Sequence, residues 1–205
     1  LDAKIEAPQK IVEVLPKPLS IKKRDPEQKN DSSKIIDYCL DHKIFKLYHF
    51  TDRKNVNFIK KHGGLYSWDY LLRNGLTIPM PGGDNLSRLL DSKYNLQNYV
   101  RTSFCKDHPM GFVAQKDGRI NDLVVLEIDP LIMTWKPTLF SDRNATRNNH
   151  LRGASFSNLK DVRLDIINGQ IPFYHLEEHK KPFYQAEVMV LEHIPSKYII
   201  NLDSI

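Results

Sequence analysis

The chain has 205 residues, of which 40% are hydrophobic and 27% charged, and its 30 Lys and Arg against 25 Asp and Glu give a formal net charge of +5. This composition can build the core of one domain, which excludes a wholly disordered chain. No apolar run approaches the roughly 18 residues of a membrane span, the start lacks a secretory signal, and two cysteines are too few for a disulfide framework. We expect a soluble cytoplasmic protein with no membrane partner, whose charge permits a polyanionic partner without establishing one.

The first 33 residues differ from the rest in composition. They hold four of the twelve prolines, no aromatic residue and the basic run Lys22 to Arg24, so they cannot bury enough surface to offset the entropy of ordering. The sequence predicts a flexible linker or arm over residues 1–33 and one folded domain over 34–205. Because the first residue is Leu1 rather than Met, we expect the chain to be a piece of a longer protein.

Beyond residue 33, short helical and extended patterns alternate without a regular βαβ rhythm. The first predicted element is a helix capped by Ser33 with Ile36, Cys39 and Leu40 on one face, followed by a strand over 46–50 and a helix that Thr51 or Asp52 caps and Gly63 and Gly64 end. Helices are then predicted over 67–74, 86–94 and 109–115, with strands over 99–104 and 123–128. A polar loop over 141–157 and strands over 185–191 and 197–202 complete the prediction. This mixture favours an α+β fold over a doubly wound sheet.

Motifs for several common chemistries are absent. The sequence has no P-loop, no G-x-G-x-x-G, no G-x-S-x-G and no H-E-x-x-H. His175 and His179 formally fit H-x-x-E-H, but prolines bracket them and no third ligand is evident, so exposed loop histidines are favoured over a zinc site. Cys105 and His108 could be a nucleophile and a base, yet a packed thiol beside a helix-capping histidine is the favoured interpretation. We expect no metal.

Three polar residues lie in or beside apolar elements. They are His49 within Leu47–Phe50, Arg88 in the helix that follows a Pro/Gly-rich break, and Glu187 within Gln185–Val190. A carboxylate in the middle of an apolar strand is costly if it is buried and unpaired, so it needs solvent or a cationic partner. Glu187 is therefore the first candidate for a functional residue, against the alternative that it faces outward from its strand.

Four segments, taken in order, resemble the DarT family, the toxins of bacterial DarT/DarG systems that ADP-ribosylate bases of single-stranded DNA. The segments are Leu47–Leu65, Tyr99–Met110, Phe140–Ala145 and Tyr184–Val188, and they contain H-F-T-D-R-K-N, Y-V-R-T-S-F, F-S-D-R-N-A and Y-Q-A-E-V. The resemblance covers about residues 45–202. It implies the ADP-ribosyltransferase fold, an α+β domain in which split antiparallel β-sheets with flanking helices form a cleft for NAD.

The resemblance also implies a catalytic pair. Glu187 matches the catalytic glutamate of the family, and Arg88 matches its essential arginine, with Arg101 as a rival. Breaking the bond between nicotinamide and ribose develops positive charge, which Glu187 would stabilise in a cleft of lowered dielectric. Glu187 would also accept the proton of the base, and Arg88 would balance the NAD phosphates and keep the glutamate ionised.

The implied contacts with NAD come mainly from the first segment. Asn55 matches the asparagine with which the family contacts NAD, whereas Asp52 stands where the family has a histidine. His49, three residues earlier, would instead face the nicotinamide. The NAD-binding residues implied by the resemblance are His49, Thr51, Asn55, Arg88 and Tyr99.

The segment from about Ser157 to Phe183 would lie beside the acceptor, as the substrate-recognising loop does in this family. Its aromatic rings would stack on unpaired bases and its basic residues would bind phosphates, with plain loop packing as the alternative. The implied substrate-binding residues are Arg143, Arg147, Phe173, Tyr174, Lys181 and Tyr184.

The function implied is NAD-dependent mono-ADP-ribosyl transfer to a base in single-stranded DNA, thymine being favoured over guanine, with release of nicotinamide. The implied partners are NAD, single-stranded DNA and a macrodomain antitoxin like DarG, in a toxin-antitoxin system with a role in phage defence. Two alternatives stay open: the same transfer to RNA or protein, and an inactive module that binds single-stranded nucleic acid.

Overall fold

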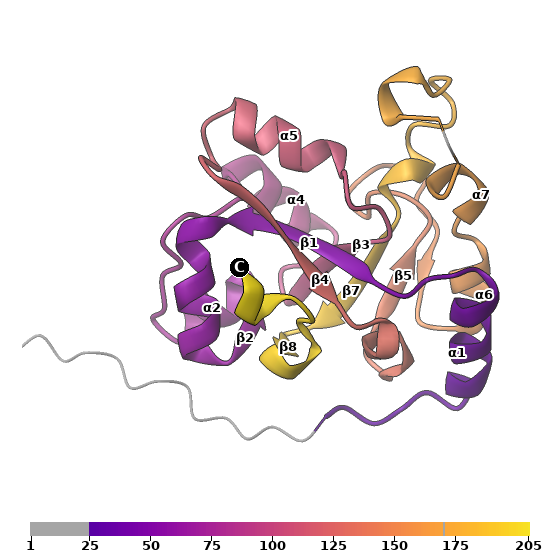
Figure 1. The fold of residues 1–205 in the computed structure, drawn as a ribbon, viewed down its shortest axis with the longest axis horizontal. Coiled ribbons are helices and arrows are strands. Elements are labelled where there is room, and N and C mark those ends of the chain that lie inside the picture. The colour runs from indigo at the N-terminus through magenta and orange to yellow at the C-terminus, as the bar shows by residue number, and fades with distance from the viewer. Residues whose placement is uncertain (1–24, 170) are drawn as a thin grey trace, which may run out of the picture.

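The computed structural model describes residues 25–169 and 171–205, and its centre is an antiparallel sheet of six strands (Figure 1). Side by side, these are β4 (Leu123–Ile128), β1 (Leu47–Asp52), β3 (Tyr99–Ser103), β7 (Glu187–Leu191), β5 (Leu139–Ser141) and β6 (Arg152–Gly153). A second antiparallel sheet pairs β2 (Gly64–Tyr66) with β8 (His193–Pro195). The expected α+β fold is confirmed.

The six-stranded sheet is split near its middle. β1 pairs with β4 along its whole length, and β3 does the same with β7. Between β1 and β3, however, the register consists of the single pair Tyr48↔Ser103. The sheet therefore has two halves, β4–β1 and β3–β7–β5–β6, that meet at one point.

Helices lie at both ends of the sheet. They are α1 (Ser32–Asp41), α2 (Val56–His62), α3 (Trp68–Arg73), α4 (Asn85–Lys93), α5 (Pro109–Lys116), α6 (Phe156–Lys160) and α7 (Leu164–Ile167), with 3-10 turns at Arg53–Asn55, Pro130–Thr134, Phe173–His175, Phe183–Gln185, Ser196–Tyr198 and Leu202–Ser204. In Figure 1, α1, α6 and α7 lie at one end, and α2 with the small sheet lies at the other.

Local signals in the sequence set where the helices begin and end. The side chains of Ser67, Asp84 and His108 accept hydrogen bonds from the first backbone N–H groups of α3, α4 and α5. Pro109 follows His108 at the first helical position, where its missing N–H costs nothing. Gly63, at a φ of 80°, ends α2 in the left-handed conformation that favours glycine.

Residues 25–33, which we assigned to the linker, are part of the folded unit, so the predicted domain start at residue 34 is too late. Lys29 is 7% exposed. Its ammonium donates to the carbonyl oxygens of Met133 at 2.9 Å and Thr138 at 2.8 Å, and burial lowers its pKa to about 8. The remainder of the expected arm, residues 1–24, lies outside the described residues.

The expected face of the first helix is right for Cys39 and wrong for Ile36 and Leu40. Ile35 and Cys39 are buried in α1, whereas Ile36 and Leu40 are exposed. Both pairs are spaced i,i+4 and both are apolar, so the sequence alone does not say which stripe packs against the turn at Pro130–Thr134.

The expected strands and loop near the C-terminal half also differ from the structure. Residues 197–202 contain 3-10 turns rather than a strand, and the interval 141–157 contains β6 and the start of α6 rather than loop alone. The strands β2 and β8 were not expected, because three residues are too few to show a period-two pattern.

Candidate active site

Glu187 is the first residue of β7, an inner strand of the six-stranded sheet. Its side chain is 8% exposed. Its Oε2 accepts hydrogen bonds from Arg101 Nη1 at 2.7 Å and from the backbone N–H of Ala145 at 2.8 Å. In register, Glu187 lies between Ser103 on β3 and Ser141 on β5. The outward-facing alternative is therefore wrong, since the carboxylate is buried beside the cationic partner that burial requires.

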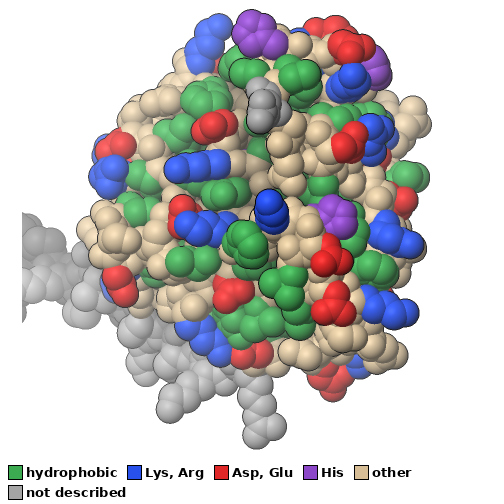
Figure 2. Space-filling view, turned by 45° about the vertical axis from the view of Figure 1, so that its right-hand side comes forward, with side chains coloured by type: hydrophobic (Ala, Val, Ile, Leu, Met, Phe, Trp, Pro, Cys, Tyr) green, Lys and Arg blue, Asp and Glu red, His purple; other side chains and the backbone are tan. Residues whose placement is uncertain are grey.

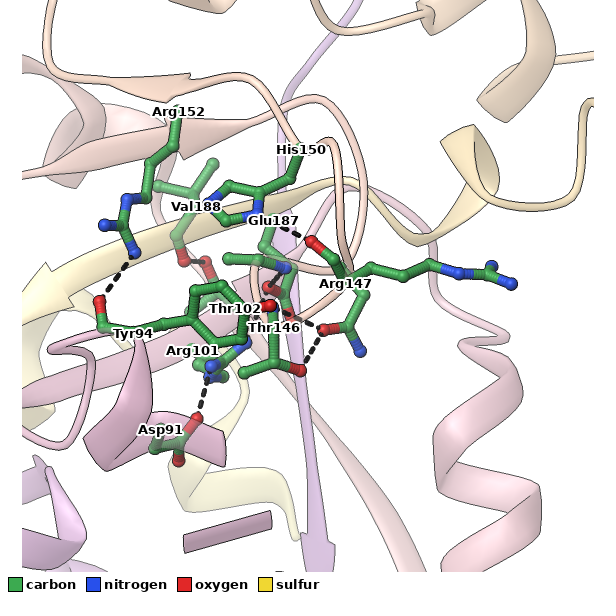
Figure 3. A network of polar contacts seen from close by, with 12 residues as sticks. Asp91, Tyr94, Arg101, Thr102, Thr146, Arg147, His150, Arg152, Glu187 and Val188 are labelled. Carbon is green, nitrogen blue, oxygen red and sulfur yellow. Dashed lines mark hydrogen bonds and ion pairs between the residues drawn. The ribbon is translucent and has the colours of Figure 1, made fainter. Parts of the chain in front are cut away.

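Arg101, and not Arg88, is the cation paired with Glu187. The Arg101 guanidinium bridges two carboxylates, binding Glu187 through Nη1 and Asp91 of α4 through Nη2 (Figure 3). Burial lowers the pKa of Arg101, but the two carboxylates outweigh burial and raise it. Arg88 lies exposed on α4 with its guanidinium 5.6 Å from the ring centroid of Trp68. The pairing with Glu187, expected of Arg88, is made by Arg101, while a contact of Arg88 with NAD phosphates stays a prediction.

The loop over residues 142–151 lies against this ion pair (Figure 3). It carries Ala145, whose N–H binds Glu187. The Tyr94 hydroxyl, at the end of α4, donates to Asn148 Oδ1 of the loop at 2.8 Å. The loop is thereby fastened to α4, which holds its backbone donor in place beside the carboxylate.

His49 lies on β1 at the split in the sheet. Its Nδ1 is 2.8 Å from the carbonyl oxygen of Arg101. Because that oxygen can only accept, Nδ1 carries the hydrogen, and Nε2 of the neutral ring is an acceptor. Burial lowers the pKa of His49, and the bond to Arg101 opposes this only in part. The lowered pKa favours the neutral ring. Its contact with nicotinamide stays a prediction.

Asn55, which we expected to contact NAD, is 1% exposed, and both the nitrogen and the oxygen of its amide are hydrogen-bonded. Nδ2 donates to Thr51 Oγ1 at 2.9 Å and to the Met80 carbonyl oxygen at 2.7 Å, while Oδ1 accepts from the Met80 N–H at 2.8 Å. Thr51 and Asn55 therefore fasten the loop that precedes α4. Direct contacts of these two residues with NAD stay predictions.

We expect Asn55→Asp to loosen the loop around Met80. The variant keeps an acceptor for the Met80 N–H but places a carboxylate oxygen against the Met80 carbonyl oxygen, which costs on the order of 1–3 kcal/mol for a buried group left unpaired. Limited proteolysis should then cleave within residues 77–83 faster than in the wild type. Asn57→Asp, at an exposed position of α2, is the control, and equal cleavage of both variants would contradict the assignment.

Tyr99, the remaining residue expected to contact NAD, begins β3. It packs against a small buried cluster of Leu96, Ala145 and Met189. This cluster includes the residue whose N–H binds Glu187, so Tyr99 lies on the same side of the sheet as the ion pair. Its contact with NAD stays a prediction.

Cys105 and His108 do not form a nucleophile and base. Burial raises the pKa of Cys105 to about 11, and its thiol lies 3.1 Å from the hydroxyl of Ser103. His108 Nδ1 accepts from the Met110 N–H at 3.2 Å, which caps α5. Burial, together with the charge of Arg101, lowers the pKa of His108 to about 4. The structure agrees with a packed thiol beside a capping histidine.

His108 should make the fold sensitive to acid. Its pKa of about 4 lies below its ordinary value of 6.5, so the unfolded chain binds the proton first as the pH falls. The contribution of His108 to the free energy of unfolding is complete above pH 6.5 and is lost between pH 6.5 and pH 4, with a loss of about 2 kcal/mol at pH 5.

The check is urea unfolding of the wild type and His108→Asn at pH 7 and pH 5. Asn keeps an acceptor for the helix cap but does not titrate, so the variant should lose less stability on acidification. His49 is common to both proteins and its effect cancels. Equal losses in the two proteins would contradict the role of His108.

The basic residues expected to bind DNA differ in whether an ion pair engages them. Arg143 pairs with Asp142 at 2.6 Å and Lys181 with Glu178 at 2.5 Å, whereas Arg147 is exposed and has no ion pair within the described residues. Figure 2 shows acidic and basic side chains interspersed over the face that carries α1, α6 and α7. The positive charge is therefore not gathered on this face, although exposed ion pairs are weak and can be exchanged for phosphates.

The aromatic residues expected to stack on bases are partly packed on one another. The Phe173 ring lies 5.6 Å from Tyr174 and 5.5 Å from Tyr184, centroid to centroid. Phe183 lies under the Arg143 guanidinium at 4.4 Å. Tyr174, at 70% exposure, is the ring most available to a base. Stacking on DNA stays a prediction for all of them.

The histidines of the H-x-x-E-H pattern do not share a helix. His175 ends a 3-10 turn, and His179 lies four residues on, beyond an extended Leu176. Within residues 25–169 and 171–205, no group of three or more His, Cys, Asp or Glu is placed to hold a metal ion. In the same ranges, no helix has the length and apolarity needed to cross a bilayer.

Three residues around the Glu187–Arg101 pair were not singled out from the sequence. Ala145 acts through its backbone N–H, for which no side-chain pattern exists. Asp91 lies one helical turn after Arg88, and only its ion pair with Arg101 of β3 distinguishes it from a surface residue. The Ser141 hydroxyl is fully buried and has no hydrogen-bond partner within the described residues, and the F-S-D-R-N-A segment was its only signal.

A comparison with models of protein families identifies the family of this chain. The model described as "ssDNA thymidine ADP-ribosyltransferase, DarT" matches residues 48–204. The chain belongs to the DarT family. It is therefore an NAD-dependent ADP-ribosyltransferase by class. No curated protein sequence gives a significant match.

Solved structures of DarT proteins share the fold. Thermus sp. 2.9 DarT in complex with ADP-ribosylated ssDNA is 16% identical, with a TM-score of 0.64 over 77% of this chain and 79% of that one. Thermus sp. 2.9 DarT in complex with NAD+ is 17% identical, with a TM-score of 0.56 over 76% and 79%. Thermosipho africanus DarTG in complex with ADP-ribose is 20% identical, with a TM-score of 0.64 over 76% of this chain and 42% of that one.

Proposed function

We propose that this DarT protein transfers one ADP-ribose unit from NAD to a base in single-stranded DNA, thymine being favoured, and releases nicotinamide. The family description names thymidine in ssDNA, and the Thermus protein was solved with ADP-ribosylated ssDNA and with NAD+. In this chain, the proposal is carried by the buried ion pair of Glu187 and Arg101. The pair engages Oε2, and no hydrogen bond within the described residues engages Oε1.

The side chains around the ion pair fit NAD as a substrate. The buried Ser141 hydroxyl has no partner within the described residues and lies beside Glu187 in register, and an unsatisfied buried polar group of this kind is a feature of functional sites. The exposed Arg88 guanidinium offers charge for phosphates, and His49 Nε2 offers an acceptor for an amide N–H. NAD supplies a ribose carbon whose leaving group is nicotinamide.

Glu187 has two tasks in this proposal. Its charge stabilises the positive charge that develops at the ribose, and Oε1 accepts the N3 proton of thymine as the new bond to the base forms. Arg101 and the Ala145 N–H hold Oε2. The carboxylate is therefore oriented before the substrate binds, which avoids an entropy cost during the reaction.

The test is incubation of the protein with labelled NAD and single-stranded oligodeoxynucleotides that each contain one target base, followed by mass spectrometry of the product. Transfer to thymine supports the proposal, and transfer to guanine instead would correct the base. Transfer confined to oligoribonucleotides or to protein would replace DNA as the substrate. Salt-sensitive DNA binding without NAD turnover would favour the inactive module.

The biological setting follows from the same proposal. Modification of DNA bases would be toxic to the cell, so we propose a neutralising macrodomain partner of the DarG kind. The Thermosipho africanus protein is a DarTG, and this chain spans 42% of it. The cytoplasmic location and the role in phage defence stay predictions.

A further inference from the structure

We propose that Asp91 and Trp68 are positioning residues that set the orientation of the Arg101–Glu187 pair, an inference that rests on the proposed function. Their contacts form a continuous chain. Trp68 Nε1 donates to Asp91 Oδ2 at 3.2 Å, Asp91 Oδ1 accepts from Arg101 Nη2, and Arg101 Nη1 donates to Glu187 Oε2 at 2.7 Å. Each side chain in this series of hydrogen bonds restrains the next.

The chain of contacts joins elements that are far apart in the sequence. Trp68 begins α3, Asp91 lies on α4, Arg101 on β3 and Glu187 on β7. None of the residues of α4 is buried, so little apolar packing holds this helix against the sheet. The ion pair of Asp91 with Arg101 is therefore a main connection between α4 and the strand that carries the arginine.

A guanidinium held by two carboxylates has a fixed plane. Arg101 uses different nitrogens for Asp91 and Glu187, so neither carboxylate can be lost without freeing the group to turn about its side-chain bonds. Within the described residues, Asp91 has no hydrogen bond with Glu187 itself. Its effect on the reaction passes through Arg101.

Asp91→Asn tests this with almost no change of shape. Both oxygens of Asp91 accept hydrogen bonds, whereas Asn has one acceptor and one N–H2 donor, so either Arg101 or Trp68 must face a donor. We expect kcat of transfer to fall about tenfold or more, while KM for NAD changes by less than about threefold. Trp68→Phe removes only the indole donor and should lower kcat by a smaller factor.

Asp69→Asn is the matched control. Asp69 follows Trp68 in sequence, whereas Asp91 meets Trp68 only in space. Asp69 pairs with Arg73 at 2.7 Å with a side chain 22% exposed, compared with 14% for Asp91. It has no hydrogen bond or ion pair with Arg101 within the described residues. The control should keep both kcat and KM, and thermal unfolding should show that each variant folds.

A double variant shows whether Asp91 acts through Arg101. In Arg101→Gln, the carboxylate of Asp91 is left without its cation, so adding Asp91→Asn should raise the unfolding midpoint and change kcat by less than about twofold. Wild-type kcat in Asp91→Asn, or a loss that simply adds to that of Arg101→Gln, would overturn the inference. If Asp91→Asn does not fold, a wild-type kcat in Trp68→Phe would overturn it. No transfer by the wild-type protein would instead be a failure of the proposed function.

Discussion

Glu187→Gln is expected to reduce ADP-ribosyl transfer by about a thousandfold or more while the protein stays folded. Glutamine has nearly the same shape, and its carbonyl oxygen can still accept hydrogen bonds from Arg101 and from the Ala145 N–H. What the variant lacks is the negative charge and a site for the proton of the base. The measurement is transfer of labelled ADP-ribose to a single-stranded oligodeoxynucleotide at saturating NAD.

Glu127→Gln is the control for removing a strand carboxylate. Glu127 lies on β4, in the other half of the sheet, with a side chain 19% exposed, and it pairs with Lys46 at 2.6 Å. This variant should keep full transfer. Transfer that survives in Glu187→Gln would remove Glu187 from the chemistry.

Arg101→Gln should have the next largest effect. It leaves the carboxylates of Glu187 and Asp91 without their shared cation, and breaking a buried ion pair in this way costs about 3–5 kcal/mol. We expect transfer to fall by about a hundredfold or more, because the carboxylate loses its main orienting partner. Transfer assays and urea unfolding measure the two effects.

Arg88→Gln separates the two candidate arginines. Arg88 is exposed and rests on Trp68, so its loss should change stability by no more than about 0.5 kcal/mol. If its charge holds the phosphates of NAD, KM for NAD rises while kcat is kept. An inactive Arg88→Gln beside a fully active Arg101→Gln would make Arg88 the essential arginine.

The sequence could predict most elements because their ends carry local signals. Asp84 and Ser67 cap helices, Pro109 starts one and Gly63 ends one, and each effect depends on neighbours within a few residues. The position of Glu187 in an apolar strand could also be predicted, since apolar residues flank it.

The partner of Glu187 could not be predicted from the sequence, because the identity of this partner depends on strand register. Arg101 reaches Glu187 because β3 and β7 are neighbours and Ser103 stands opposite Glu187. Arg88 matched the family by its place before the strand, which says nothing of what lies across the sheet. Lys29 was missed for a similar reason, since a proline-rich segment without aromatic residues gives no sign that one lysine fits between two distant carbonyl groups.

The single register pair between β1 and β3 leaves the middle of the sheet with less strand pairing than either half. His49 and Thr51 belong to one half, and Arg101 and Glu187 belong to the other. A small rotation about Tyr48 and Ser103 would change the separation of these two sets of side chains and keep every ladder hydrogen bond within each half, at the cost of the hydrogen bond between His49 Nδ1 and the Arg101 carbonyl oxygen. The width of the candidate site is therefore set by one register pair and one side-chain bond rather than by a continuous strand pairing.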